Sequence, residues 1–247
     1  MAVLYWQRGA CEITMGVYSV KERLNRDTIA MRVAKELPDG AVVNLGIGIP
    51  TLVSQYVPPG RSILYHSESG VLIYGPMADP GEEDVDLINA GGQFLKRVPG
   101  MAFFHSADAF AMIRGGHVDV AVLGALQVSE DGDLANWMIP DRGVGNVGGG
   151  MDLATGAKRI IVAMEHNDRN GEPKILRQCT YPLTGLACVG LIVTDLAVIQ
   201  VLGIDGGESD KSGLMLLEVA PGWSSEEVQA LTEASLGISP ELKEIEL

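Results

Sequence analysis

Glu68 is the residue of this sequence best placed to act as a carboxylate nucleophile. It follows the apolar segment 62–66, and Ser69-Gly70 and a second apolar segment, 71–73, follow it. In α/β sheets, side chains at the carboxyl end of a strand lie where these folds bind their ligands. The apolar flanks favour partial burial, and a carboxylate that has lost hydration is a stronger nucleophile. From these residues alone, a solvated surface charge remains the alternative interpretation.

Backbone N–H groups that could stabilise an oxyanion are predicted at Gly148-Gly149-Gly150, which open a predicted helix. Successive residues without Cβ let a ligand come close, and N–H groups at a helix start can hold negative charge. Asn44 is a second candidate, because it is a polar residue that closes an apolar strand. Gly46 and Gly48 follow it, where a phosphate loop could lie, although a plain tight turn also explains them.

One segment of this sequence resembles a dinucleotide-binding motif but lacks its required context. Residues 143–148 match the pattern GxGxxG, and a predicted helix, a predicted strand and Glu165 follow them. The strand that must directly precede the first glycine is missing, because Pro140-Asp141-Arg142 stand there. The earlier glycine segment fails as well, because Thr51 occupies its third glycine position. A nicotinamide or flavin site is therefore disfavoured.

The composition indicates a soluble globular protein rather than a disordered or nucleic-acid-binding chain. The 247 residues are 47% hydrophobic and 20% charged, with a net charge of −14. An acidic surface argues against nucleic acid and anionic membranes as partners. Segment 185–204 imitates a membrane span, but Asp195 and its many valines and isoleucines favour two buried strands joined by a turn.

The cysteines and histidines give no metal pattern. Cys11, Cys179 and Cys188 are odd in number and widely spaced, and the four histidines are scattered. We therefore predict no metal site and a reducing, cytoplasmic location. Residues 1–17 are interpreted as an N-terminal extension, and residues 18–247 as one domain.

The elements that must position these side chains alternate between helix and strand. The expected fold class is α/β, with a mostly parallel sheet and helices on both faces. Predicted helices cover residues 20–37, 50–56, 107–114, 151–157 and 224–235, and predicted strands cover 41–45, 62–66, 117–123, 159–164, 190–194, 197–201 and 213–218. Residues 77–86 are predicted to form an acidic loop.

Several ordered segments resemble the B half of family I CoA-transferases. His66-Ser67-Glu68-Ser69-Gly70 resembles the HSENG active-site motif of that family. Segments 43–53, 86–91, 110–140, 148–166 and 179–189 resemble further segments of the B half in the same order, and the similarity spans about residues 19–220. The family includes 3-oxoacid, acetoacetyl and 3-oxoadipate CoA-transferases, and its fold agrees with the α/β expectation.

The resemblance implies a role for each candidate residue. Glu68 is the nucleophile, Asn44 lies beside it, and the backbone at Gly149 and Gly150 contributes to the oxyanion site. Glu68 attacks an acyl-CoA such as succinyl-CoA, giving an acyl–glutamyl anhydride and then a glutamyl-CoA thioester. A short 3-oxo acid such as acetoacetate then leaves as its CoA ester, a ping-pong mechanism. Coenzyme A is thus a substrate held transiently on Glu68, with no other cofactor and no metal implied.

The resemblance also implies a partner, because family members carry a CoA-binding A half, here a separate CoA-transferase A chain in an A2B2 assembly. Two positions near the site depart from the family pattern. Ser69 replaces the asparagine after the nucleophile, and Gly92 follows Gly91 where many relatives have lysine. These departures keep an acyl-CoA hydrolase open as an alternative, and a non-catalytic partner chain is a third interpretation.

Overall fold

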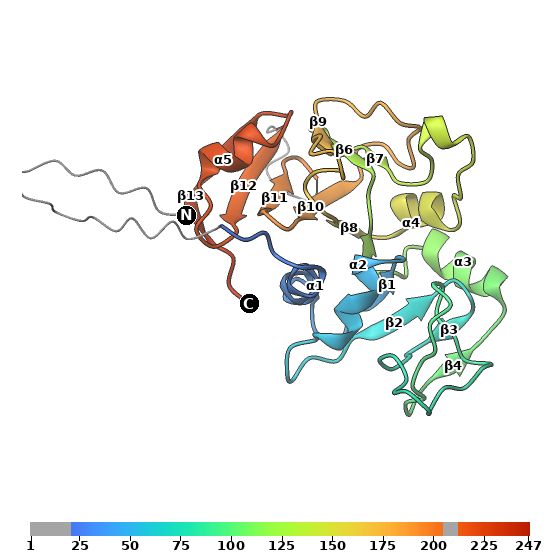
Figure 1. The fold of residues 1–247 in the computed structure, drawn as a ribbon. Coiled ribbons are helices and arrows are strands. Elements are labelled where there is room, and N and C mark those ends of the chain that lie inside the picture. Colours follow the sequence, from blue (N-terminus) through green and yellow to red (C-terminus); the bar gives the residue numbers. More distant parts are fainter. Residues whose placement is uncertain (1–20, 205–211) are drawn as a thin grey trace, which may run out of the picture.

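A ten-stranded sheet runs through the whole molecule in the order β13-β12-β11-β10-β8-β5-β1-β2-β3-β4 (Figure 1). The computed structural model describes residues 21–204 and 212–247, so the predicted extension 1–17 and Cys11 lie outside the described residues. The strands of this sheet are β1 (Val42–Leu45), β2 (Leu64–Ser67), β3 (Val71–Leu72), β4 (Ala102–Phe103), β5 (Val120–Leu123), β8 (Arg159–Ala163), β10 (Val189–Val193), β11 (Ala197–Val201), β12 (Leu214–Val219) and β13 (Leu236–Glu244).

The centre of the sheet is parallel. Strands β2, β1, β5, β8 and β10 pair in parallel, while β11 and β3 continue the sheet in antiparallel pairs on either side. Three shorter strands, β6 (Gln127–Ser129), β7 (Leu134–Ala135) and β9 (Ile175–Leu176), form a separate small sheet. The expected mostly parallel α/β architecture is confirmed, and its parallel strands end at a common edge.

Helices cover both faces of the sheet, because its central strands are apolar on both sides. In β5, Val120 and Val122 face one core, and Ala121 and Leu123 face the other. The helices are α1 (Arg26–Ala34), α2 (Ile49–Leu52), α3 (Ser106–Arg114), α4 (Gly150–Gly156) and α5 (Ser225–Ala230), with short 3-10 turns at Val53–Gln55 and Pro140–Arg142. Helices α1 and α2 pack into the first core, and α3, α4 and α5 into the second.

Two predicted helices are shorter than expected. The helix predicted at 20–37 begins only at Arg26, because the side chain of Asn25 accepts a hydrogen bond from Thr28 N–H and caps the first turn. Residue 20 lies outside the described part of the chain. The helix predicted at 224–235 starts with the expected Ser224 cap but ends at Ala230, where the chain turns into β13. The helix predicted at 50–56 is α2 and then a 3-10 turn.

Strand β13 and the short strands β3, β4, β6, β7 and β9 were not predicted. All but β13 are two or three residues long, too short for an alternating pattern to emerge. Strand β13 has Pro240 in its interior, which argues against a strand unless it lies at an edge. It does lie at the edge, with β12 as its neighbour in the sheet.

The apolar segment 185–204 forms two buried strands, as predicted. Strands β10 and β11 pair in antiparallel fashion and turn at Thr194-Asp195. The Thr194 side chain accepts hydrogen bonds from the N–H groups of Leu196 and Ala197, which fixes the turn. Among residues 21–204 and 212–247, no helix is long and apolar enough to cross a membrane.

His166 is buried beyond the end of β8, and we expect it to make stability depend on pH. Its two ring nitrogens contact the hydroxyls of Thr194 (3.0 Å) and Thr232 (2.9 Å). Burial lowers the pKa of His166 to about 4, although Asp195 opposes this effect. Because the unfolded chain takes up this proton near its ordinary pKa of about 6.5, the stabilisation is complete above that pH and is lost as pH falls towards about 4. The loss over the window is about 3 kcal/mol.

Urea denaturation of the wild type and of His166→Gln at intervals between about pH 7 and pH 4 measures this contribution. Because the two proteins differ only at residue 166, the difference between the pH dependences of their free energies of unfolding reports the contribution of His166. An identical pH dependence in the two proteins would contradict the prediction.

Candidate active site

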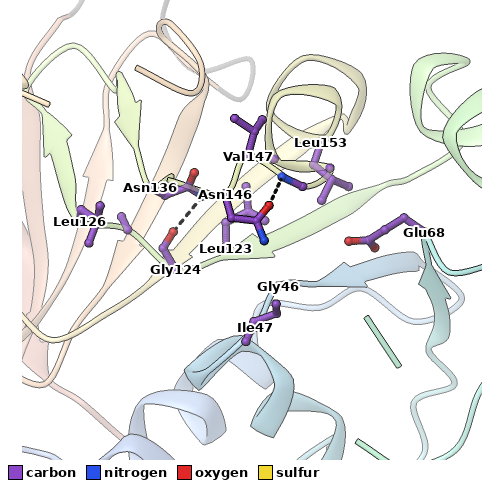
Figure 2. A pocket seen from close by; sticks show the side chains of 14 residues that line it. Gly46, Ile47, Glu68, Leu123, Gly124, Leu126, Asn136, Asn146, Val147 and Leu153 are labelled. Atoms are coloured by element: carbon purple, nitrogen blue, oxygen red, sulfur yellow. Dashed lines mark hydrogen bonds between the residues drawn. The ribbon is translucent and has the colours of Figure 1, made fainter. Parts of the chain in front are cut away.

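A cavity of about 350 Å³ opens at the carboxyl ends of β1, β2 and β5. Its walls come from the turn after β1, the Glu68 turn, the segment after β5 and the loop that leads into α4, whose lining residues include Gly46, Ile47, Glu68, Gly124, Asn136, Asn146, Gly148, Gly149 and Gly150. Figure 2 shows the Glu68 carboxylate pointing into the space bounded by Gly46, Ile47 and Asn146. Four segments far apart in the sequence therefore meet around one carboxylate.

Glu68 is placed by a tight turn between β2 and β3. Strand β2 ends at Ser67, and Gly70 adopts φ +104, a conformation that residues with a side chain rarely adopt. A Cβ at Gly70 would lie 2.1 Å from the carbonyl oxygen of Phe104, so the turn also packs too closely for a side chain. Glu68 is half-buried as a result, which agrees with the partial burial expected from its apolar flanks.

Asn44 contacts Glu68 directly. The parallel register of β1 and β2 places Asn44 beside His66, one strand away. Asn44 Nδ2 donates to Glu68 Oε2 (3.0 Å) and also lies 3.1 Å from His66 Nδ1. Asn44 is fully buried, and His66 is 1% exposed. One amide nitrogen therefore holds one oxygen of the carboxylate and leaves the other oxygen towards the cavity.

Among Gly148, Gly149 and Gly150, Gly149 lies closest to that second oxygen. A Cβ built on Gly149 would lie 3.6 Å from Glu68 Oε1 and 3.2 Å from the Phe110 ring. The Gly150 N–H donates to Val147 O (2.9 Å), and the Gly148 N–H donates to Asn146 Oδ1 (3.1 Å). The hydrogen bonds of the described residues include none from the Gly149 N–H, which leaves it available to a ligand.

Gly46, Gly48 and Ser69 occupy different parts of this region. Gly46 lines the cavity, and its N–H donates to Val122 O, so the chain there lies against β5. Gly48, with φ +96, precedes α2 and lines a neighbouring cavity of about 170 Å³ that also contacts Ile47. Ser69 is exposed, and its hydroxyl forms a hydrogen bond with the Ser67 hydroxyl (2.8 Å) rather than with the Glu68 carboxylate.

The turn at Gly91-Gly92 lies near the rim of the cavity. A Cβ on Gly91 would lie 3.8 Å from the Ile47 side chain, which is 71% exposed. Gly92 adopts φ +76 with open space around it. A lysine at this position would fit sterically, but it would adopt an unfavourable backbone conformation that costs about 1 kcal/mol.

The sequence interpretation missed several residues of the site. His66 was not predicted as a site residue, although its position opposite Asn44 follows from the strand register. Phe110 and Asn136 come from segments in which neighbouring residues do not point to a site. Asn146 lies within the GxGxxG match at residues 143–148, which was rejected as a dinucleotide site. In the structure, residues 143–148 lie between a 3-10 turn and α4, with no strand directly before them, so this segment is not a dinucleotide loop.

Metal ligation has no support among the described residues. Within residues 21–204 and 212–247, no three His, Cys, Asp or Glu side chains are grouped so that they could hold an ion. Cys179 and Cys188 are free, and burial raises the pKa of the Cys188 thiol to about 11. At neutral pH the Cys188 thiol is therefore protonated and a poor nucleophile.

The family model and the similar proteins found by comparison all belong to one family. Residues 26–230 match the family model described as Coenzyme A transferase. The chain is 48% identical over 216 residues to the B chain of the 3-oxoadipate CoA-transferase of Acinetobacter baylyi, covering 87% of this chain and 95% of that protein. It is also 48% identical over 220 residues to the mouse "Succinyl-CoA:3-ketoacid coenzyme A transferase 2B, mitochondrial", covering 89% of this chain but 41% of that longer protein.

The fold has a solved counterpart as well. An acyl-CoA transferase from Escherichia coli O157:H7, solved as a thioester complex with CoA, superposes with a TM-score of 0.69 at 21% identity. The match covers 94% of this chain and 45% of that one. At this identity the likeness shows the fold alone, and it agrees with the central parallel sheet described above.

Proposed function

This chain belongs to the coenzyme A transferase family, as a CoA-transferase of the 3-oxoacid and 3-oxoadipate type, and we propose that Glu68 carries its chemistry. In this proposal the enzyme moves CoA from an acyl-CoA, such as succinyl-CoA, to a short 3-oxo acid. The observation that carries the proposal is the geometry of Glu68: a half-buried carboxylate with one oxygen bound to Asn44 Nδ2 and the other beside Gly149.

The first half of the reaction forms an anhydride and then a thioester. Glu68 Oε1 attacks the acyl carbonyl, the carbon–sulfur bond breaks, and CoA leaves as its thiolate. The thiolate then attacks the Glu68 carboxyl carbon, which places negative charge on Oε2. When that intermediate collapses, the bond from the carboxyl carbon to Oε1 breaks and the first acid departs as a carboxylate. CoA remains on Glu68 as a thioester.

The second half runs these steps in reverse with the acceptor acid. Each half passes through tetrahedral oxyanions, which fixed N–H donors stabilise best when they already point at the developing charge. Asn44 Nδ2 is 3.0 Å from Oε2, where charge develops as the thiolate attacks Glu68. The Gly149 N–H is the proposed donor to the acyl oxyanion, and the turn at Gly150 supports it through its bond to Val147 O.

We further propose a separate CoA-transferase A chain as partner, in an A2B2 assembly. The bacterial relatives that this chain matches over nearly their whole length are named as the B chains of their enzymes. The cavity rim supports a partner, since Ile47 is 71% exposed although it is apolar and lines the cavity. Covering this rim would also keep water from the anhydride, which hydrolysis would otherwise destroy.

The test uses the chain assembled with its A partner. Succinyl-CoA or acetoacetyl-CoA without an acceptor acid should give a CoA adduct on Glu68, seen as a mass increase on this chain and removed by borohydride reduction. Addition of an acceptor acid should return the CoA as a new ester. If no adduct forms on this chain with either donor, the proposed role of Glu68 is wrong.

An acyl-CoA hydrolase is the second candidate function. The two positions that depart from the family pattern, Ser69 and Gly92, are the reason to test it. Ser69 turns its hydroxyl to Ser67, and Gly92 offers no charge to a substrate carboxylate. A transferase predicts that CoA passes to an acid, whereas a hydrolase releases free CoA at the same rate whether or not an acid is present. Measuring both products across 3-oxo acids with one and two carboxylates separates these outcomes and identifies the preferred acid.

Gly149 gives a prediction that concerns the cavity rather than the nucleophile. Its φ of −90° and ψ of 8° allow alanine, so Gly149→Ala should fold with a shift of the Phe110 ring by a few tenths of an ångström. The added methyl would lie 3.6 Å from Glu68 Oε1 and 3.2 Å from the Phe110 ring, in space that the acyl group needs. We expect kcat to fall about tenfold, in line with a displacement of reacting groups by a fraction of an ångström.

Steady-state kinetics and thermal unfolding of Gly149→Ala check this expectation together. A wild-type kcat at an unchanged melting temperature would show that the acyl group does not occupy the space beside Gly149.

A further inference from the structure

A single atom of the Asn44 amide, Nδ2, contacts two neighbouring side chains. Asn44 Nδ2 is 3.0 Å from Glu68 Oε2 and 3.1 Å from His66 Nδ1. Because Nδ2 carries two protons and no lone pair, both contacts require an acceptor on the other side. The carboxylate supplies one acceptor, and the imidazole supplies the other only when its Nδ1 carries no proton.

Rotating the Asn44 amide by half a turn would exchange its oxygen and its nitrogen. The oxygen would then face the Glu68 carboxylate and the lone pair of His66 Nδ1, and neither can donate a proton to it. In the observed orientation, Asn44 Oδ1 has no hydrogen-bond partner among the described residues. The orientation therefore depends on the two acceptors around Nδ2 rather than on a donor to Oδ1.

We propose that His66 is a positioning residue: its unprotonated Nδ1 holds the Asn44 amide with an N–H directed at Glu68. The proposal rests on the proposed function of Glu68, because it explains how the donor to Glu68 Oε2 is kept in place. His66 itself does not touch the reacting atoms. It acts through Asn44.

The surroundings of His66 favour the neutral ring. Its side chain is 1% exposed, and the Phe104 ring from the segment before α3 lies against it with ring centroids 6.4 Å apart. Burial lowers the pKa of His66, while the Glu68 carboxylate and the backbone carbonyl of Ala109 in α3 partly oppose this effect. Glu68 is the charged group that acts on the ring, and Asn44 from β1 is neutral. With Nδ1 unprotonated, the neutral ring carries its proton on Nε2, which is buried without a hydrogen-bond partner among the described residues.

Protonation of His66 would reverse the arrangement. Nδ1 would become a donor, and the Asn44 amide would turn its oxygen to it. Because one atom of the amide faces both neighbours, the same oxygen would then face Glu68 Oε2. The donor to the developing oxyanion would be replaced by an acceptor. Catalysis is therefore supported above the pKa of His66 and lost as pH falls through it.

The experiment compares His66→Leu and His66→Asn in the chain assembled with its A partner. Leucine removes the acceptor, whereas asparagine can offer its Oδ1 at the position of Nδ1 but cannot titrate. The exposed His117 allows a matched control, His117→Asn. The readouts are the rate of CoA adduct formation on Glu68 from succinyl-CoA and acetoacetyl-CoA, kcat and KM, and the pH dependence of kcat.

We expect His66→Leu to lower kcat and the rate of adduct formation about tenfold, with KM for the acyl-CoA little changed. His66→Asn should restore most of the rate at neutral pH and should lose the His66 part of the acid limb, which His117→Asn retains. If His66→Leu does not fold, the pH profile of His66→Asn decides alone.

The proposal is overturned if His66→Leu reacts at the wild-type rate, or if the acid limb of His66→Asn matches that of the wild type. These results differ from failure of the proposed function, in which the wild type itself forms no CoA adduct on Glu68.

Discussion

Replacing Glu68 by alanine is expected to lower kcat of the assembled enzyme by at least about 10⁴-fold, because in the proposed mechanism the Glu68 carboxylate forms the covalent bond to CoA. The same loss is expected for Glu68→Gln, since a neutral amide is not a nucleophile even though it keeps the size of the side chain. Mass spectrometry of the chain after incubation with acyl-CoA should find no adduct in either variant.

Glu68→Asp distinguishes a nucleophile from a charge that merely binds substrate. The shorter side chain withdraws the carboxylate by about 1.5 Å from the space beside Gly149, and displacements of this size cost about 10²-fold in rate. Glu172→Gln is a matched control, because Glu172 is exposed and lies outside the cavity. If Glu68→Ala keeps a kcat within about tenfold of the wild type, the nucleophile is another residue.

Replacing Asn44 by alanine should lower kcat by about 10² to 10³-fold, the usual cost of removing one donor from an oxyanion site. The physical reason is its position: Asn44 Nδ2 donates to Glu68 Oε2, the atom on which, in the proposed mechanism, charge develops when the thiolate attacks Glu68. Since the contact matters most in the transition state, KM for the acyl-CoA should change much less than kcat.

Asn44→Asp gives the complementary measurement. It preserves the size of the side chain but places a second acceptor next to the Glu68 carboxylate, so we expect a loss at least as large as that of Asn44→Ala. Thermal unfolding of both variants separates this effect from instability, because Asn44 is fully buried. A kcat for Asn44→Ala within about threefold of the wild type would rule out a donor role for this amide.

The order and type of most elements could be predicted from the sequence because their apolar patterns are local. Strands β1, β5, β8, β10 and β11 were predicted within three residues at either end, and the β10–β11 turn at Thr194-Asp195 follows from a polar pair inside an apolar run. Helix limits were less accurate where one capping side chain decides the boundary, as Asn25 does for α1.

Strand β13 shows where local pattern fails. Its residues pair with β12 only because the chain returns from α5 to the edge of the sheet, and Pro240 is tolerated there because that edge carries no further strand among the described residues. The short strands of the small sheet exist for a similar reason. Their few residues adopt extended structure through their pairing partners rather than through their own pattern.

Local patterns were enough to predict that Glu68 directly follows a strand, that Asn44 lies near the end of another, and that the glycines at 148–150 lead into a helix. They could not establish that these groups meet. The parallel register of β1 and β2 places Asn44 beside His66, and only then can its amide reach the Glu68 carboxylate at 3.0 Å. The packing of α4 against α3 likewise brings Gly149 to Phe110 and to the other carboxylate oxygen. Such contacts join residues far apart in the chain, and pairing and packing across the sheet, rather than any local pattern, bring them together.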